Sequence, residues 1–181
     1  MNRREFFQLS ARAAAITGYG FAPALGLASS GYRCREMTVA EFHGARKFVP
    51  TEQGRIACLD VGEGPAALFL HGFPLNSFQW RGVVPLLSML RRCIAPDFLG
   101  LGYTEVTAGQ NVGAQAQVAM IAQLLDKLGV SAVDIVANDS GGAVAQLLVA
   151  RYPDRARSLL LTAEAMTLRL LPGSCMNSGR N

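Results

Sequence analysis

The chain has 181 residues, of which 50% are hydrophobic and 17% are charged, the composition of an ordinary globular domain rather than of a disordered or fibrous protein. Its formal net charge of +4 arises largely from arginines that precede residue 40. Beyond that point the basic residues are scattered and lack the interleaved aromatic residues that stack on bases, which argues against a nucleic-acid partner.

Residues 1–30 have the features of an export signal. Two adjacent arginines, Arg3 and Arg4, stand before bulky apolar residues, and residues 11–30 are rich in alanine and glycine without an acidic side chain. This segment resembles a twin-arginine signal peptide. The resemblance implies that the export machinery is a partner and that the mature protein is periplasmic or extracellular. Glycines and a proline weaken a spanning helix, so we expect no stable membrane anchor after cleavage.

The remainder of the chain is organised as an α/β domain. From Arg46 onward, short β-rich runs alternate with helical stretches, which is typical of a sheet with helices packed on its faces. We expect a linker at residues 31–45, a partial α/β domain at residues 46–165 and an irregular tail at residues 166–181.

The predicted strands begin with a hairpin, in which residues 47–49 and 55–61 flank a turn at residues 52–54. The run 66–70 is wholly apolar, which suits a strand of a parallel sheet that is buried on both faces. Three further runs are expected to be buried strands of the same kind: residues 92–95, 133–137 and 158–161.

Helical spacing falls between these strands. In the second of the predicted helices, apolar residues recur on one face from Val118 to Leu128, and Gly129 is expected to stop it. The third ends before Pro153, which cannot continue a helix. The three helices are expected at residues 83–90, 112–128 and 143–152.

The four cysteines are Cys34, Cys58, Cys93 and Cys175. They show neither close pairing nor the His and Cys spacing of a metal site, so we expect no metal. Cys58 and Cys93 fall in strand-like segments, where a buried thiol is a better interpretation than a disulfide.

A sharp turn is predicted where the strand at residues 133–137 runs into the third helix. The sequence there fits a nucleophile elbow, a strained turn at which a large side chain two places before or two and three places after the nucleophile would collide with its neighbours. With Asp139 as the nucleophile, those places hold Ala137, Gly141 and Gly142, which are all small.

The alternative nucleophile is Ser140, which would put Asn138 and Ala143 at the outer places and fits less well. A carboxylate nucleophile attacks carbon and forms an ester, which water then cleaves. Ser140 would then contribute its backbone N–H to an oxyanion hole, together with the N–H of Phe73.

The loop that supports this hole is expected at His71 and Gly72, which follow a buried strand. A glycine pair after a strand could also belong to a nucleotide-binding crossover. The chain contains no G-x-G-x-x-G motif and no Walker lysine, which disfavours a nucleotide site.

Several motifs together resemble the epoxide hydrolase and haloalkane dehalogenase branch of the α/β-hydrolases, over about residues 46–162. The resemblance implies the α/β-hydrolase fold, a mostly parallel sheet with helices on both faces, and an aspartate nucleophile that acts on a small-molecule substrate without a cofactor. These motifs are His71-Gly72-Phe73-Pro74, Trp80, the segment 96–104 and Asn138-Asp139-Ser140-Gly141-Gly142.

The chain departs from this branch at several points. Dehalogenases hold the halide with an Asn and a Trp at the positions of Phe73 and Ser140, so the sequence fits epoxide hydrolases better. The ring-opening tyrosines of epoxide hydrolases belong to a cap domain that this chain does not contain. The last strands and the cap would follow residue 165, so we interpret the chain as truncated or frame-shifted.

The catalytic histidine of the family follows the nucleophile and the acid. The histidines of this chain are His43 and His71, and both precede Asp139. Glu164 stands where some dehalogenases place the acid, although a solvated loop carboxylate is the favoured interpretation, because the sequence shows only that the residue lies near a strand end. His71 is expected to support the oxyanion loop, and His43 to lie at the surface of the linker.

The leading hypothesis is therefore an exported hydrolase with an aspartate nucleophile, resembling epoxide hydrolases or dehalogenases and incomplete as given. Without the histidine the ester would not be hydrolysed. One alternative is a non-catalytic fragment or binding module that retains the turn only for packing. Another is a serine esterase that uses Ser140.

Overall fold

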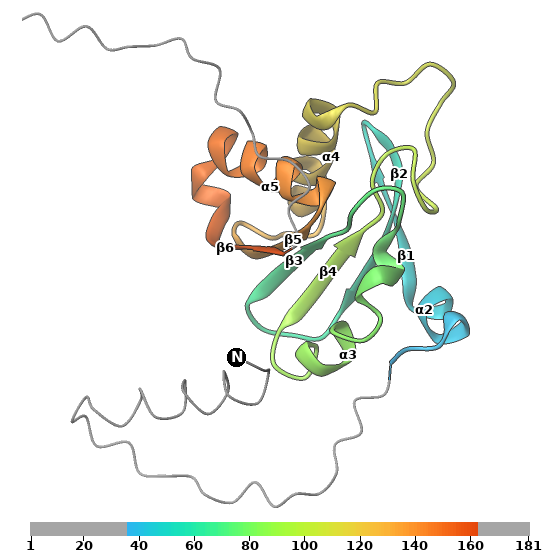
Figure 1. Cartoon of the computed structure of the whole chain (residues 1–181), viewed down its shortest axis with the longest axis vertical. Coiled ribbons are helices and arrows are strands. Elements are labelled where there is room, and N and C mark those ends of the chain that lie inside the picture. Colours follow the sequence, from blue (N-terminus) through green and yellow to red (C-terminus); the bar gives the residue numbers. More distant parts are fainter. Residues whose placement is uncertain (1–35, 163–181) are drawn as a thin grey trace, which may run out of the picture. The chain divides into compact units, whose positions relative to one another are not determined.

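The computed structural model of the protein describes residues 36–162 (Figure 1). The predicted signal peptide, the predicted tail and Glu164 lie outside the described residues. Within residues 36–162, none of the helices combines the length and the apolar character needed to cross a membrane.

A six-stranded sheet forms the centre of the described part, in the order β1-β2-β4-β3-β5-β6. The hairpin β1–β2 and the pair β2–β4 are antiparallel, whereas β3 pairs in parallel with β4 and β5, and β5 with β6. Every predicted strand is confirmed within a few residues at its ends. The strands are β1 Arg46–Thr51, β2 Gly54–Val61, β3 Ala66–Leu70, β4 Arg92–Pro96, β5 Val133–Asn138 and β6 Ala156–Thr162.

Helices cover both faces of the sheet, with α4 and α5 on one side and α2 and α3 on the other (Figure 1). This arrangement confirms the predicted α/β class. Gly129 adopts a positive φ of 67° directly after Leu128, the C-cap of α4, as expected for the residue that stops this helix. The helices are α2 Val39–Ala45, α3 Val84–Leu87, α4 Ala114–Lys127 and α5 Ser140–Arg151, with 3₁₀ turns η1 Ser77–Trp80 and η2 Pro153–Arg155.

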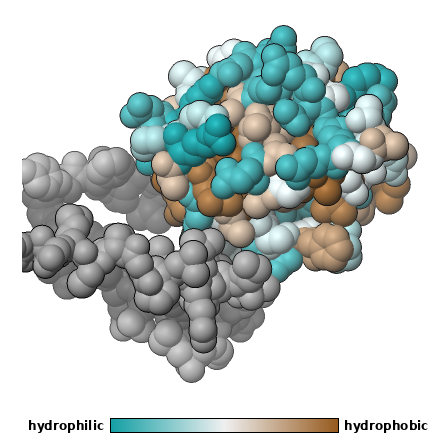
Figure 2. Space-filling view, turned by 90° about the horizontal axis from the view of Figure 1, so that it is seen from above, coloured by the Kyte–Doolittle hydropathy of each residue, from teal (hydrophilic) through white to brown (hydrophobic). Residues whose placement is uncertain are grey.

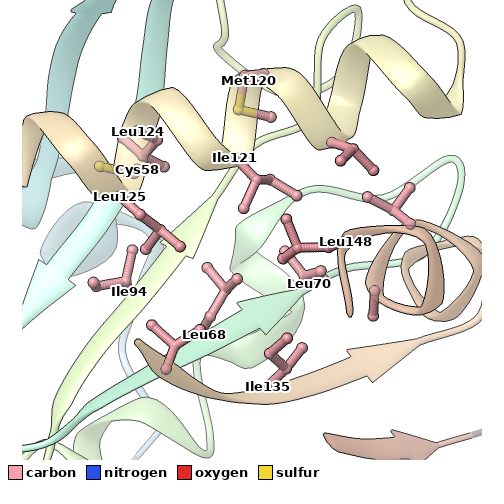
Figure 3. Close-up of a cluster of buried hydrophobic side chains, with 14 of the residues drawn as sticks. Cys58, Leu68, Leu70, Ile94, Met120, Ile121, Leu124, Leu125, Ile135 and Leu148 are labelled. Carbon is pink, nitrogen blue, oxygen red and sulfur yellow. The ribbon is translucent and has the colours of Figure 1, made fainter. Parts of the chain in front are cut away.

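The core has two layers because side chains alternate across the strands. Leu68 and Leu70 of β3 face α4 and α5, where they meet Ile121 and Leu148 (Figure 3). Phe69 points to the opposite face, toward a second cluster that includes Trp80, Val84 and Phe42. All residues of β3 are buried, so the prediction of a strand buried on both faces is confirmed.

Three helical segments differ from the sequence-based expectation. The helix predicted at residues 83–90 is limited to α3, and Met89 and Leu90 are exposed in the turns that lead into β4. The third helix begins at Ser140, three residues earlier than expected. Residues 39–45, within the expected linker, form α2, which a Thr38–Glu41 capping box starts and whose Phe42 is fully buried.

Residues 158–161 form a strand as expected, but the expectation that this strand is buried is wrong. Leu159 is 37% exposed and Leu160 is 57% exposed. Within the described residues β6 pairs only with β5, so it forms an edge of the sheet there, and Leu160 lies across from Val136 on the face that α5 does not cover. An apolar sequence predicts a strand but does not show how many neighbours it has.

The two described cysteines are confirmed as buried free thiols. Burial raises the pKa of Cys58 to about 12 and that of Cys93 to about 11. Both therefore remain protonated and unreactive at neutral pH.

A charged cluster joins β5 and β6 at Asp134. Its carboxylate accepts hydrogen bonds from Ser158 Oγ at 2.7 Å, from Arg157 Nη2 at 3.0 Å and from Arg91 Nη1. The hydrogen bonds from Ser158 and the two arginines lower the pKa of Asp134 from 3.8 to about 2. The native state therefore favours the charged form of this carboxylate more strongly than the unfolded chain does.

We expect Asp134 to make folding pH-dependent in the acid range. Because its folded pKa is depressed, its contribution is fully present above the unfolded pKa of 3.8 and is lost as the pH falls through about 2. We expect Asp134→Asn to lower the free energy of unfolding by about 1–2 kcal/mol at neutral pH, after allowance for the partial exposure of the site, and by less near pH 2. Urea unfolding of both proteins at the two pH values measures this, and an equal gap at both would contradict it.

Candidate active site

The backbone is strained at Asp139, where β5 turns directly into α5. Asp139 has φ 50° and ψ −125°, and among residues 36–162 it is the only residue other than glycine with a positive φ. Such a conformation costs free energy and is maintained only when the surroundings require it. The structure thus places Asp139 at the apex of the turn, whereas Ser140 is the first residue of α5.

The small residues predicted around this turn are needed because neighbouring backbone lies very close. A Cβ on Gly141 would lie 2.6 Å from the carbonyl oxygen of His71 and 2.7 Å from that of Leu70. Ala137, two places before Asp139, is fully buried. Gly142 is less restricted, since a Cβ there would lie 3.6 Å from the nearest side-chain atom.

The loop after β3 meets the turn as the sequence predicted. The backbone N–H of Phe73 donates to Asp139 Oδ2 at 3.2 Å and to Ser140 Oγ at 2.9 Å. This close approach requires glycine at position 72, because a Cβ there would lie 2.8 Å from Asp139 Cβ. The structure therefore brings four of the predicted site residues together: Gly72, Phe73, Asp139 and Ser140.

His71 supports this loop. The residue is fully buried, and its Nε2 accepts a hydrogen bond from the N–H of Phe98 at 3.1 Å. The ring proton therefore lies on Nδ1, which donates to the Gly72 carbonyl oxygen at 3.0 Å. Burial lowers the pKa of His71, so the ring is neutral and both nitrogens are occupied. This geometry agrees with the predicted scaffold role.

Both ring nitrogens of the second histidine, His43, also have polar partners. His43 Nδ1 lies 2.7 Å from Arg46 Nη1, and its Nε2 lies 3.1 Å from the hydroxyl of Tyr103. Glu164, the predicted acid, lies outside the described residues. Among residues 36–162, the structure therefore brings neither histidine into hydrogen-bond contact with Asp139 or Ser140.

The segment 96–104 shapes the wall beside the turn. The buried Asp97 carboxylate accepts hydrogen bonds from the N–H of Ser77 at 2.8 Å and from that of Tyr103 at 2.8 Å. Gly102 has a φ of 58°, and a Cβ there would lie 2.3 Å from Asp97 Oδ2. The glycines of this motif therefore serve the loop conformation, and Asp97 joins the loop to η1.

An apolar cavity of about 450 Å³ opens next to Phe73 and Ser140. Its lining contains no charged side chain. The amide of Gln117 in the wall is already bonded, since its Oε1 accepts from the N–H of Leu99 and its Nε2 donates to the carbonyl oxygens of Leu99 and Val112. The cavity is lined by Phe73, Phe98, Leu99, Gly100, Leu101, Val112, Ala114, Gln117, Ser140, Ala143 and Val144.

Apolar side chains also reach the surface near this loop. Phe73 is 68% exposed and Leu75 is 50% exposed. Figure 2 shows that hydrophobic residues lie between hydrophilic ones on one face of the described part. Within residues 36–162, no group of three or more His, Cys, Asp or Glu side chains could hold a metal ion.

Two residues with a clear place in this site were not singled out from the sequence as functional residues. Gln79 of η1 donates from Nε2 to Asn138 Oδ1 at 2.7 Å and accepts at Oε1 from the N–H of Gly72 at 3.1 Å. Asn138 entered the sequence-based interpretation only through its size and as part of the motif around Asp139. Since Gln79 and Asn138 are 59 positions apart in the chain, no local pattern indicates that they meet.

The comparison with known proteins agrees with this geometry. The profile of the alpha/beta hydrolase fold family matches residues 65–176. The chain belongs to this family. The predicted fold is thereby confirmed, and the match spans the strained turn and the loop that meets it.

The relatives include a haloalkane dehalogenase and an epoxide hydrolase, as the motifs predict, and also a hydrolase of another kind, which the motifs do not predict. A 2-hydroxy-6-oxo-2,4-heptadienoate hydrolase of Pseudomonas putida is 40% identical over 105 residues, which cover 56% of this chain and 38% of the relative. Haloalkane dehalogenase 2 of Mycobacterium tuberculosis is 31% identical over 115 residues, covering 64% of this chain and 40% of the relative. An epoxide hydrolase is also among the relatives.

The solved structures show the same relationship. A meta-cleavage product hydrolase from Pseudomonas fluorescens aligns with a TM-score of 0.64 and 31% identity, over 67% of this chain and 46% of that structure. The chain spans about two fifths of the length of the curated relatives that it matches.

Proposed function

We propose that this chain carries the nucleophile of an α/β-fold hydrolase, Asp139, which attacks a carbon atom of an epoxide or a haloalkane. The observation that carries the proposal is the position of the carboxylate. Asp139 stands at the apex of a strained turn, and its Oδ2 accepts the N–H of Phe73 at 3.2 Å. With Oδ2 held in this way, Oδ1 is the oxygen that attacks.

In the first step Oδ1 forms a bond to carbon. With a haloalkane the carbon–halogen bond breaks and the halide leaves. With an epoxide a ring carbon–oxygen bond breaks, its electron pair goes to the ring oxygen, and that oxygen takes a proton from water. Both reactions leave an ester on Asp139.

In the second step water attacks the carbonyl carbon of the Asp139 ester, and negative charge develops on Oδ2. The N–H groups of Phe73 and Ser140 would stabilise that charge. This step needs a base to activate the water. Since His43 and His71 are bonded elsewhere, we expect this chain to form the ester and to hydrolyse it very slowly.

The cavity favours an uncharged substrate. A charged group would lose its hydration in a lining without a charged side chain, and both N–H donors of the Gln117 amide are already used. We therefore propose alkyl or aryl epoxides and haloalkanes rather than substrates that bear a carboxylate.

Mass spectrometry of the chain after incubation with styrene oxide or 1-bromohexane tests the proposal. We expect a stable adduct on the peptide that contains Asp139, which hydroxylamine removes because it cleaves esters. An adduct that resists hydroxylamine would indicate alkylation of a thiol instead. No adduct with any substrate would contradict the proposal and favour a non-catalytic fragment.

A second candidate is a serine esterase. Ser140 lines the cavity, and its Oγ accepts the N–H of Phe73 at 2.9 Å. An organophosphonate probe would label Ser140 in that case. We expect no such labelling, because neither histidine of the chain contacts the Ser140 hydroxyl.

We also propose that residues 1–30 direct export through the twin-arginine machinery, which the adjacent Arg3 and Arg4 support. We expect a fusion of these residues to a folded reporter to be exported from a bacterial cell. Replacement of both arginines by lysine should leave the reporter inside, because the motif is recognised by more than its charge. Equal export of both fusions would contradict this assignment.

A further inference from the structure

We propose that Gln79 is a positioning residue for the reaction at Asp139, an inference that rests on the proposed function. Its side-chain amide lies between the two segments that form the site. It accepts the N–H of Gly72 at 3.1 Å on one side and donates to Asn138 Oδ1 at 2.7 Å on the other. Gln79 itself is not among the residues that line the cavity, and its side-chain hydrogen bonds go to Gly72 and Asn138 rather than to Asp139.

The direction of each hydrogen bond is determined by the partners. A backbone N–H can only donate, so it must meet Oε1 of Gln79, which leaves Nε2 to face Asn138. Asn138 must then accept with Oδ1, and its Nδ2 donates to the carbonyl oxygen of Thr162 at 2.8 Å and to its hydroxyl at 3.2 Å. Both amides therefore have a single orientation.

The hydrogen bonds of Gln79 reach residues that lie one position away from the reacting groups. Gly72 precedes Phe73, whose N–H holds Oδ2, and Asn138 precedes Asp139 itself. Gln79 thus links the loop after β3 to the last residue of β5, beside the donor and the nucleophile. Because reaction rates depend steeply on small changes in such geometry, this link should affect the rate of ester formation more than substrate binding.

The first test is the rate of ester formation as a function of styrene oxide concentration. We expect Gln79→Leu to lower the limiting rate by about 10- to 100-fold and to leave the half-saturating concentration nearly unchanged. Gln123→Leu is the matched control, since Gln123 also bridges two elements but binds Glu52, at the turn between β1 and β2. An unchanged limiting rate in Gln79→Leu would overturn the proposal.

Gln79→Glu provides a measurement whose pH dependence a purely structural role would not explain. A protonated carboxyl group can accept from Gly72 and donate to Asn138, whereas a carboxylate can only accept. Partial burial and the nearby Asp139 should raise the pKa of the introduced group. We therefore expect the limiting rate of Gln79→Glu, divided by that of the unmodified chain, to rise between about pH 8 and about pH 5.5. A ratio of the two limiting rates that does not change with pH would contradict the proposed role of Gln79.

Hydrogen exchange separates this inference from the proposed function, because it needs no reaction. We expect Gln79→Leu to speed exchange of the Gly72 N–H by at least about tenfold, while the Leu99 N–H, which the Gln117 amide holds, stays protected. If the unmodified chain forms no ester but exchange responds as expected, the proposed function fails and the link stands. If the ester forms and neither rate nor exchange responds, the proposed role of Gln79 is wrong.

Discussion

Asp139→Asn is expected to abolish ester formation with every epoxide and haloalkane tested, a loss of at least about 100-fold. The amide has the same shape as the carboxylate, so the turn and the N–H of Phe73 should remain in place. It lacks the negative charge that attacks carbon. Intact-mass measurement of both proteins after equal incubation gives the comparison.

Ser140→Ala is the matched control for this result. It removes the hydroxyl that accepts the N–H of Phe73 but keeps the backbone N–H of residue 140. We expect ester formation within a few-fold of the original rate. If Ser140→Ala abolished labelling and Asp139→Asn did not, Ser140 would be the nucleophile.

The second large effect is expected at Gly141. We expect Gly141→Ala to lower the free energy of unfolding by about 3 kcal/mol or more, because the new Cβ would overlap two backbone carbonyl oxygens that cannot move aside independently. Those carbonyls belong to Leu70, at the end of β3, and to His71, in the loop that follows. Urea unfolding followed by circular dichroism measures the change.

Gly142→Ala, one residue later, is the control. The space at Gly142 accommodates a Cβ, and alanine favours the helix, so this variant should be neutral or more stable by about 0.5–1 kcal/mol. Equal destabilisation by both substitutions would show that the close approach of β3 to the turn is not the cause.

The parts of the fold that depend on local pattern were predictable. The apolar run of β3 indicated a strand buried on both faces, and the spacing in α4 indicated one buried helical face. The small residues around Asp139 indicated a crowded turn, since large side chains cannot fit where neighbouring backbone lies so close.

Features that depend on pairing between distant segments were not predictable. The exposure of Leu160 follows from the number of strands that β6 contacts, which its own sequence does not encode. The extension of α5 to Ser140 follows from the turn, although serine and two glycines are weak helix formers.

The sequence by itself determined the order of strands and helices, the hydrophobic faces and the place of the turn at Asp139, because periodicity and steric demand act over a few neighbouring residues. Only the tertiary structure decided which groups meet there. It brought the N–H of Phe73 to Asp139 across 66 positions of the chain and Gln79 to Asn138 across 59. It also gave both ring nitrogens of His71 a hydrogen-bond partner. These contacts depend on how the strands pair, and strand pairing is a property of the whole sheet.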